Sequence, residues 1–127
     1  MLTKIANADD LKPVAAMLHD ARFTADAIAF DAEARTFALR CWVLEPKPTA
    51  AGNSRRWRAC RLSFENVTDC KVTAKEKVRY YELGTIRFSE RNRKLHLVAH
   101  YAIEISLVVG ELDGVLTETD ETRDKWE

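Results

Sequence analysis

Short catalytic motifs are missing from this 127-residue sequence, and glycine, which many of them require, occurs only four times. The chain has no Gly-rich phosphate-binding loop, no GxSxG nucleophile elbow and no HExxH zinc motif. It also has no serine in the glycine-rich context that builds an oxyanion hole. These absences leave enzymatic activity undecided, but they favour a non-enzymatic protein that needs no cofactor.

Long apolar runs and cysteines are equally scarce. No apolar run approaches the ~20 residues that a membrane span requires, and the N-terminal MLTKIANADDL lacks the apolar stretch of a secretory signal. Cys41, Cys60 and Cys70 have no CxxC spacing, and their odd number excludes complete pairing within one chain. We therefore expect a cytoplasmic protein with reduced thiols and no membrane contact.

What the sequence does contain is typical of one globular domain. Hydrophobic residues make up 46% and charged residues 31%, which argues against disorder. A chain of this length is long enough to bury one core without disulfides or metals. We predict a single domain over residues 1–127.

The clearest pattern is a period of two between Leu95 and Val109. Every odd position is apolar, whereas the even positions include His96 and Glu104. This alternation predicts extended chain with one buried face. A straight strand of this length would span ~50 Å, but the domain is only ~35 Å across. We therefore predict a bend, or two tightly joined strands, around Ala99–Ala102.

Other patterns predict the remaining elements. A helix is expected from about Asp10 to His19, because Asp9 or Asp10 can cap it and Pro13 is tolerated in the first turn. Strands are expected at about 23–30, 36–44, 56–64, 85–88 and 115–116, with a loop at 46–54. Segment 66–83 has no clear pattern. This order predicts a mainly β (α+β) fold, an antiparallel curved sheet or meander with one N-terminal helix packed on it.

Four stretches carry a resemblance to a known group of proteins. They are ADDLKPVAAMLHDARF (8–23), RTFALRCWVLEP (35–46), RRWRACRLSFENVTDCKV (55–72) and IEISLVVGELDGVL (103–116). Together they resemble small bacterial proteins classified as domains of unknown function. The resemblance implies a bacterial protein and transfers no catalytic residue.

Charge is balanced overall but unevenly distributed. The chain has 20 basic and 20 acidic residues, yet residues 46–110 carry +7 and residues 111–127 carry −5. We expect residues 118–127 to form a mobile acidic tail that lies against the basic surface, because opposite charges attract within a Debye length of ~8–10 Å.

The candidate binding face is the arginine-rich strand 55–61. Arg56 and Arg58 share one side of this strand, and Trp57 and Arg61 share the other. A basic surface with an aromatic can contact phosphates and stack a base. However, the pI of about 6.8 is low for a dedicated nucleic-acid domain, and arginines on an edge strand also prevent unwanted sheet pairing.

Histidines and tyrosines give weaker indications. His96 and His100 have HxxxH spacing, but on a strand they lie ~13 Å apart, too far to share one zinc, so we expect no metal site. Tyr80 and Tyr81 are typical of a pocket or interface, although tyrosines at the rim of a core are commoner.

Protein–protein binding is the function that these observations favour. Apolar residues are expected on both sheet faces, and a single helix cannot cover all of them. They include Trp42, Leu44, Val98 and Val108. We expect a non-enzymatic binding or scaffold module whose partner is another protein or a second copy in a homodimer. The alternative is a nucleic-acid or polyanion binder that uses strand 55–61, and an enzyme with a pocket inside the curved sheet is the third hypothesis.

Overall fold

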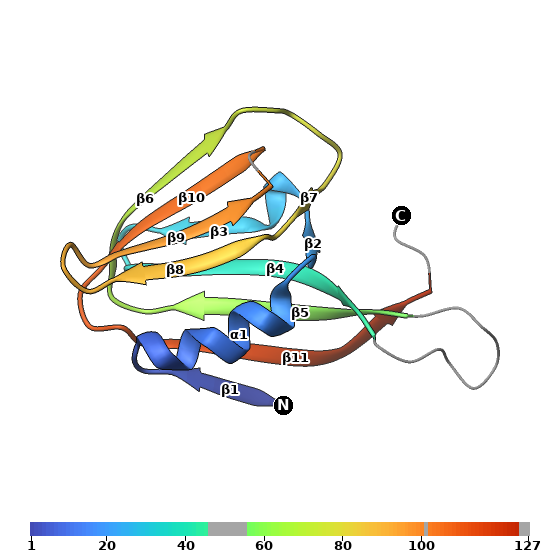
Figure 1. Ribbon diagram of the computed structural model, residues 1–127, viewed down its shortest axis with the longest axis horizontal. Helices are drawn as coiled ribbons and strands as arrows, with labels where there is room; N and C mark the ends of the chain where they lie inside the picture. Colours follow the sequence, from blue (N-terminus) through green and yellow to red (C-terminus); the bar gives the residue numbers. More distant parts are fainter. Residues whose placement is uncertain (46–55, 101, 125–127) are drawn as a thin grey trace.

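Two antiparallel sheets face each other, and one α-helix lies along the open side between them (Figure 1). The structure is a computed structural model that describes residues 1–45, 56–100 and 102–124. The larger sheet has seven strands in the order β1-β11-β5-β4-β2-β7, with β3 also paired to β4. The smaller sheet has the order β6-β10-β9-β8. The expected mainly β fold with one N-terminal helix is confirmed.

The strands of the larger sheet are β1 (Leu2–Ile5), β2 (Arg22–Phe23), β3 (Ile28–Asp31), β4 (Thr36–Leu44), β5 (Trp57–Phe64), β7 (Tyr81–Glu82) and β11 (Gly114–Arg123). Those of the smaller sheet are β6 (Val67–Ala74), β8 (Thr85–Ser89), β9 (Lys94–Ala99) and β10 (Ile103–Val109). The helices are α1 (Leu11–Leu18) and the short 3-10 turns η1 (Ala8–Asp10) and η2 (Ala25–Ala27). The expected loop at 46–54 lies outside the described residues.

The period-two segment folds as the hairpin of β9 and β10, which confirms the prediction of a tight junction. Ala102 N–H donates to the Ala99 carbonyl at 2.9 Å, and His100 has a φ of 41°. A left-handed residue lets the chain reverse within three positions. The hairpin thus fits a fifteen-residue apolar pattern into a domain too narrow for one straight strand.

The core lies between the inner faces of the two sheets. Leu97, Ile103, Ile105 and Leu107 are at most 3% exposed, as predicted. They pack in one cluster with those apolar residues of β4 and β5 that the pleat directs inward. One continuous cluster therefore contains the apolar residues of both sheets and of α1.

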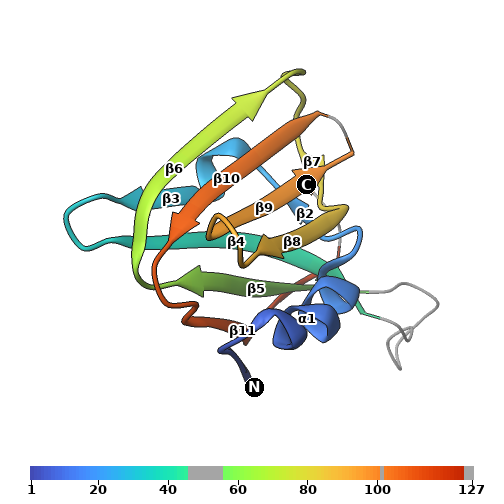
Figure 2. The ribbon, with the colours of Figure 1, turned by 60° about the vertical axis from the view of Figure 1, so that its left-hand side comes forward.

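Two of the chain passages between the sheets, β5 to β6 and β10 to β11, lie at the same end of the molecule (Figure 2). Glu65 N–H donates to the Asp113 carbonyl at 2.8 Å, and Gly110 N–H donates to the Asn66 carbonyl at 2.9 Å. These bonds satisfy backbone groups where the chain leaves the ladders. These two passages therefore join the sheets at this end, and the passages into and out of β7 join them a second time.

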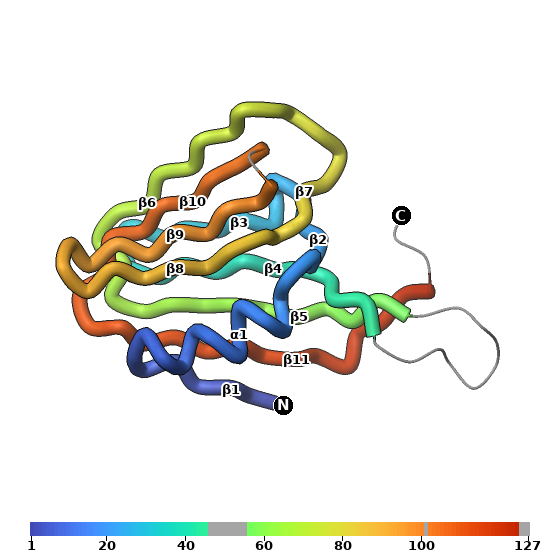
Figure 3. The backbone as a smooth tube through the Cα atoms, in the orientation of Figure 1, coloured from blue at the N-terminus to red at the C-terminus, as the bar shows by residue number. Residues whose placement is uncertain are grey.

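The helix α1 buries Leu11, Val14 and Leu18 and lies beside β8, as the tube in Figure 3 also shows. Its start agrees with the prediction, with Asp10 at the N-cap position, but the expected capping hydrogen bond is not made. Neither the Asp9 nor the Asp10 side chain caps the helix, since the Asp10 carboxylate instead accepts a hydrogen bond from Ala6 N–H at 2.8 Å. Asn7 caps the preceding turn η1 by accepting from Asp10 N–H at 3.0 Å.

β1 was not expected from the sequence, and two further expectations need correction. β1 has only four residues, too few to show a period, and it is stabilised by pairing with the distant β11. The strand expected at 23–30 is divided into β2 and β3 by η2. β11 continues to Arg123, so residues 118–123 of the expected tail form a strand, while residues 125–127 lie outside the described part of the chain.

The close approach at Gly114 generates a prediction. A Cβ there would lie 2.5 Å from the ring of the buried Phe64, whereas a Cβ at Gly110 would meet nothing closer than 3.8 Å. Because overpacking a rigid core costs about 1–3 kcal/mol, Gly114→Ala should lower the free energy of unfolding by that amount in urea titrations. Gly110→Ala is the matched control, and equal stability of the two variants would contradict the packing argument.

A candidate binding groove

The groove originates in the divided strand beside β4. Both β2 and β3 pair with the same edge of β4, at Trp42 and at residues 36–39 respectively. Between these two pairings the turn η2 leaves the sheet, so no strand pairs with Arg40 on this edge. The outer face of β4 is therefore hollowed at this point.

The groove has a volume of about 800 Å³. Side chains from β2 and η2, from β4, from the segment before β7 and from the end of β11 line it. The lining residues are Phe23, Thr24, Asp26, Ala27, Arg40, Trp42, Arg79, Tyr80 and Arg123. Its walls thus combine aromatic rings with three guanidinium groups, and four separate segments contribute.

Trp42 forms the centre of the groove. Its side chain points away from the core, yet the residue is only 8% exposed. The Arg123 guanidinium lies 4.3 Å from the ring centroid and that of Arg40 lies 5.2 Å from it. Two cation–π contacts therefore cover this ring. The helix α1 packs elsewhere, against the core beside β8.

An acidic side chain of the protein already contacts the groove. The Glu121 carboxylate, on β11, accepts a hydrogen bond from the Arg40 guanidinium, and both side chains are about half exposed. Asp124 likewise pairs with Arg56 at 3.4 Å. Acidic residues near the C-terminus thus lie against basic ones, as the charge distribution predicts, although through an ordered strand.

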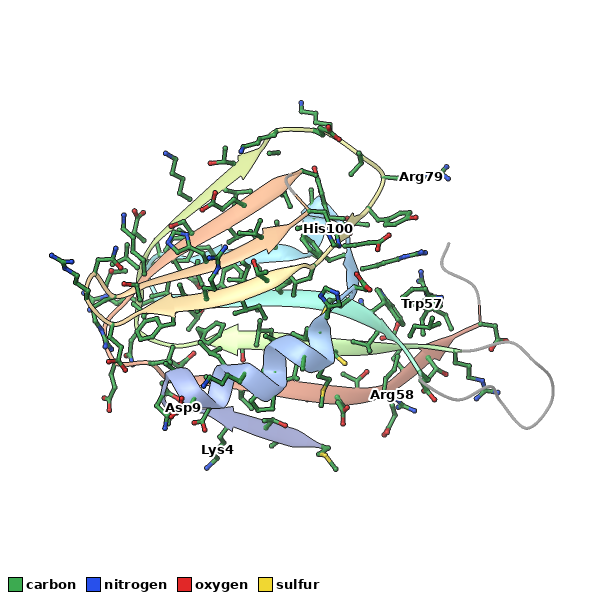
Figure 4. All side chains as sticks on the ribbon, viewed as in Figure 1. Lys4, Asp9, Trp57, Arg58, Arg79 and His100 are labelled. Atoms are coloured by element: carbon green, nitrogen blue, oxygen red, sulfur yellow. The ribbon has the colours of Figure 1, made fainter. Side chains whose placement is uncertain are left out.

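A second layer supports the aromatic wall. The Arg22 guanidinium lies 4.5 Å from the centroid of Tyr80 and 4.6 Å from that of Trp57. Its Nε is also 3.9 Å from Glu82 Oε1. Figure 4 shows Trp57 beside the strands of the larger sheet and Arg79 on the segment that precedes β7. Arg22 therefore connects strand 55–61 to the groove wall through Tyr80.

The candidate face predicted from sequence is only partly assembled. Trp57 and Arg61 point to the outer face, where Arg61 lies opposite Arg40. Arg58 points to the inner side, pairs with Glu45 at 2.8 Å and donates to the Thr119 carbonyl at 2.7 Å. Arg56 is exposed and paired with Asp124. The four residues therefore do not form one surface.

Sequence reasoning missed most of the groove. Arg22, Arg40, Arg79 and Arg123 come from different segments, and no local spacing connects them. One usable signal was Trp42 next to Arg40, because an aromatic on the outer face of a strand needs a cover. Tyr80 does line a groove, which is one of the two roles expected for it.

The HxxxH histidines have different neighbours. His96 Nδ1 lies 3.0 Å from Glu104 Oε1 on the outer face of the smaller sheet. His100 is in the β9–β10 turn, where its Nε2 lies 3.4 Å from Asp20 Oδ1. His100 therefore lies in a turn and not on the expected strand, and the two imidazoles have different partners.

The three cysteines are free and poorly suited to nucleophilic chemistry. Burial raises the pKa of the Cys41 thiol well above its ordinary range, and the facing Cys60 raises it further. Burial, followed by the Glu118 carboxylate, raises the pKa of Cys60 to about 11. The pKa of Cys70 is also raised, by burial and by Asp69. A reactive thiol needs the opposite shift.

These features define a small two-sheet protein with an arginine- and tryptophan-lined groove and unreactive thiols. Residues 3–125 match the family described as "Protein of unknown function (DUF2948)". The chain belongs to this family. No curated protein matches it, and no solved structure does. Among the described residues, no helix is long and apolar enough to cross a membrane.

The thiol environments predict an order of reactivity. Cys70 is the least buried of the three, so it should react first with a disulfide reagent such as DTNB in the native protein. Cys60, with a pKa of about 11, has only about one thiolate in a thousand at pH 8. Cys70→Ser should therefore remove nearly all native labelling, and denatured protein should still show both remaining thiols. Fast labelling of Cys41 or Cys60 in the native state would contradict this order.

Proposed function

We propose that this protein is a non-enzymatic protein-binding module whose groove beside Trp42 accepts an acidic segment of a partner protein. The observation that carries the proposal is the Glu121 carboxylate on Arg40 at the groove. A carboxylate of the chain itself thus makes the same contact with Arg40 that an acidic partner would make. Guanidinium groups pair with carboxylates through directional, charge-assisted bonds.

The composition of the groove supports a protein ligand over a nucleic acid. Asp26 lines the groove, and Glu121 sits at its edge, so closely spaced phosphates would meet two carboxylates. A peptide can place acidic and apolar side chains alternately and so avoid this repulsion. The aromatic rings support the same ligand class, because tryptophan, tyrosine and arginine are enriched in protein interfaces.

The groove is also suited to rapid, salt-sensitive binding. Arg40 and Arg123 are held by stacking on Trp42, so these two side chains lose little freedom when a ligand binds. The contacts are half-exposed, so salt screens them over ~8–10 Å. The partner is another protein or a second copy of this chain, and sedimentation at increasing protein concentration distinguishes the two. We propose the cytoplasm as the compartment, which the free thiols support.

Fluorescence anisotropy with a labelled ten-residue peptide of alternating Glu and Leu tests the proposal. We expect binding that weakens as salt rises, and a loss of at least fivefold in affinity for Arg40→Gln and for Arg123→Gln. Arg87→Gln is the matched control, because this exposed arginine lies on β8 of the other sheet. Glu121→Gln should strengthen binding about 1.4- to 5-fold, since breaking an exposed pair worth about 0.2–1 kcal/mol removes an internal competitor.

Two further probes decide between ligand classes. A peptide of alternating Lys and Leu should not bind, and single-stranded oligo-dT should bind more weakly than the acidic peptide. Tighter binding of oligo-dT, lost in the Arg40 variant, would replace the proposal with the nucleic-acid alternative. Equal binding of both peptides, or no binding of either, would refute a groove that selects carboxylates.

A further inference from the structure

A second cluster of polar side chains lies where three connections meet. His19 and Asp20 belong to the turn between α1 and β2, Glu82 ends β7, and His100 belongs to the turn between β9 and β10. Figure 4 shows the labelled His100 at the end of the hairpin, on the side of the molecule that carries β7. The cluster therefore joins the larger sheet to the smaller one, and its members come from segments that are far apart in the sequence.

Backbone hydrogen bonds hold these connections together. Asp20 N–H donates to the Leu83 carbonyl at 2.8 Å, and Gly84 N–H donates to the Val98 carbonyl at 2.8 Å. A Cβ at Gly84 would lie 3.2 Å from the Val98 carbonyl oxygen and 3.7 Å from the His100 ring. The missing side chain thus lets the segment after β7 approach β9 and the imidazole closely.

The donor atoms have spacings that suit one metal ion. Asp20 Oδ1 lies 3.4 Å from His100 Nε2 and 3.7 Å from His19 Nε2. One ligand atom from each of Asp20, Glu82 and His100 lies within 4.8 Å of the others. Ligands at the usual Zn²⁺ distances of about 2.0–2.2 Å are about 3.4 Å apart in a tetrahedron. Three of the four residues therefore lie within reach of one ion, and His19 lies beside Asp20 at the edge of this group.

The orientation of His19 is a separate observation that favours a metal. Its Nδ1 lies 3.2 Å from the Gly84 carbonyl oxygen. A carbonyl only accepts, so Nδ1 carries the hydrogen in the neutral ring, and the Nε2 lone pair points toward Asp20. Histidines that bind metals are held in this way, by donating the other ring N–H to a carbonyl or carboxylate.

We propose that His19, Asp20, Glu82 and His100 form a Zn²⁺ site that links the two sheets. Two imidazoles and two carboxylates are a ligand set that Zn²⁺ accepts. The carboxylates balance the charge of the ion, and the cation facing them is Arg22, whose Nε lies 3.9 Å from Glu82 Oε1. His19, Asp20 and His100 are at least half exposed, so the ion reaches the site directly from solvent.

Titration calorimetry with ZnCl₂ tests the site in the full chain without a histidine tag. Cys70→Ser serves as the background, so that the most accessible thiol does not contribute. The test variants are His19→Gln, Asp20→Asn and His100→Asn. Asparagine is chosen for the last two because Asp20 and His100 have φ of 67° and 41°, a region that asparagine tolerates. Circular dichroism confirms that each variant is folded.

The expected result is binding of one Zn²⁺ per chain that weakens at least tenfold in each test variant. His96→Gln is the matched control and should bind as the background protein does, because His96 pairs with Glu104 elsewhere. At one fixed Zn²⁺ concentration, the Tm should also rise more for the background and for the control than for the His100 variant. An ion that binds only the native state raises stability in this way.

Two results would overturn the proposal. The first is no heat of binding and no Tm shift at a Zn²⁺ concentration well above that of the protein. The second is Zn²⁺ binding that persists unchanged in the His19, Asp20 and His100 variants. Substitution with Co²⁺ gives an independent readout, since tetrahedral nitrogen and oxygen ligation produces intense visible absorption without thiolate charge-transfer bands. Thiolate bands would assign the ion to cysteine instead.

Discussion

The pairing of β4 with β5 at the centre of the larger sheet is the constraint on which the other features depend. Their register places Cys41 opposite Cys60 and Leu39 opposite Leu62, all pointing into the core. The same pleat sends Arg40 and Trp42 to the opposite face. A slip of one residue would exchange these sets and bury a guanidinium. The burial of one face of β4 thus determines which residues of this strand, Arg40 and Trp42, line the groove.

Trp42 also shows how a polar surface can protect an apolar side chain. Two guanidinium groups lie against its ring, and one of them is neutralised by Glu121. Arginine suits this role, because its planar group is weakly hydrated and stacks while still donating hydrogen bonds at its edge. The arrangement keeps tryptophan on a solvent-facing sheet surface at only 8% exposure without a covering helix.

The sequence predicted elements where local periodicity is strong. β4, β5 and the β9–β10 hairpin follow from alternating burial, and α1 follows from its apolar stripe and Pro13. β1 and the second half of β11 could not be predicted, because each depends on a strand distant in sequence. β1 pairs with the first half of β11, and the second half of β11 pairs with β5. η2 was missed for a similar reason, since its position depends on which part of β4 is already paired.

The site was less predictable than the fold. Trp57, Arg61 and Tyr80 were identified as candidates from their types alone. However, the groove and the histidine–carboxylate cluster both depend on residues that only the topology brings together. His19 and His100 are an example, because their proximity requires the turn after α1 to contact the turn of a hairpin in the other sheet.

The borders of the two sheets determine how this protein can associate with other chains. Along the larger sheet the terminal strands β1 and β7 have only four and two residues, and β8 of the smaller sheet has five. Short edge strands offer few unpaired backbone groups with which a strand of another chain could pair. β6 is longer, with eight residues, but Asp69 and Lys71 place charges along it. Recognition through side chains is therefore better supported than the addition of a β-strand.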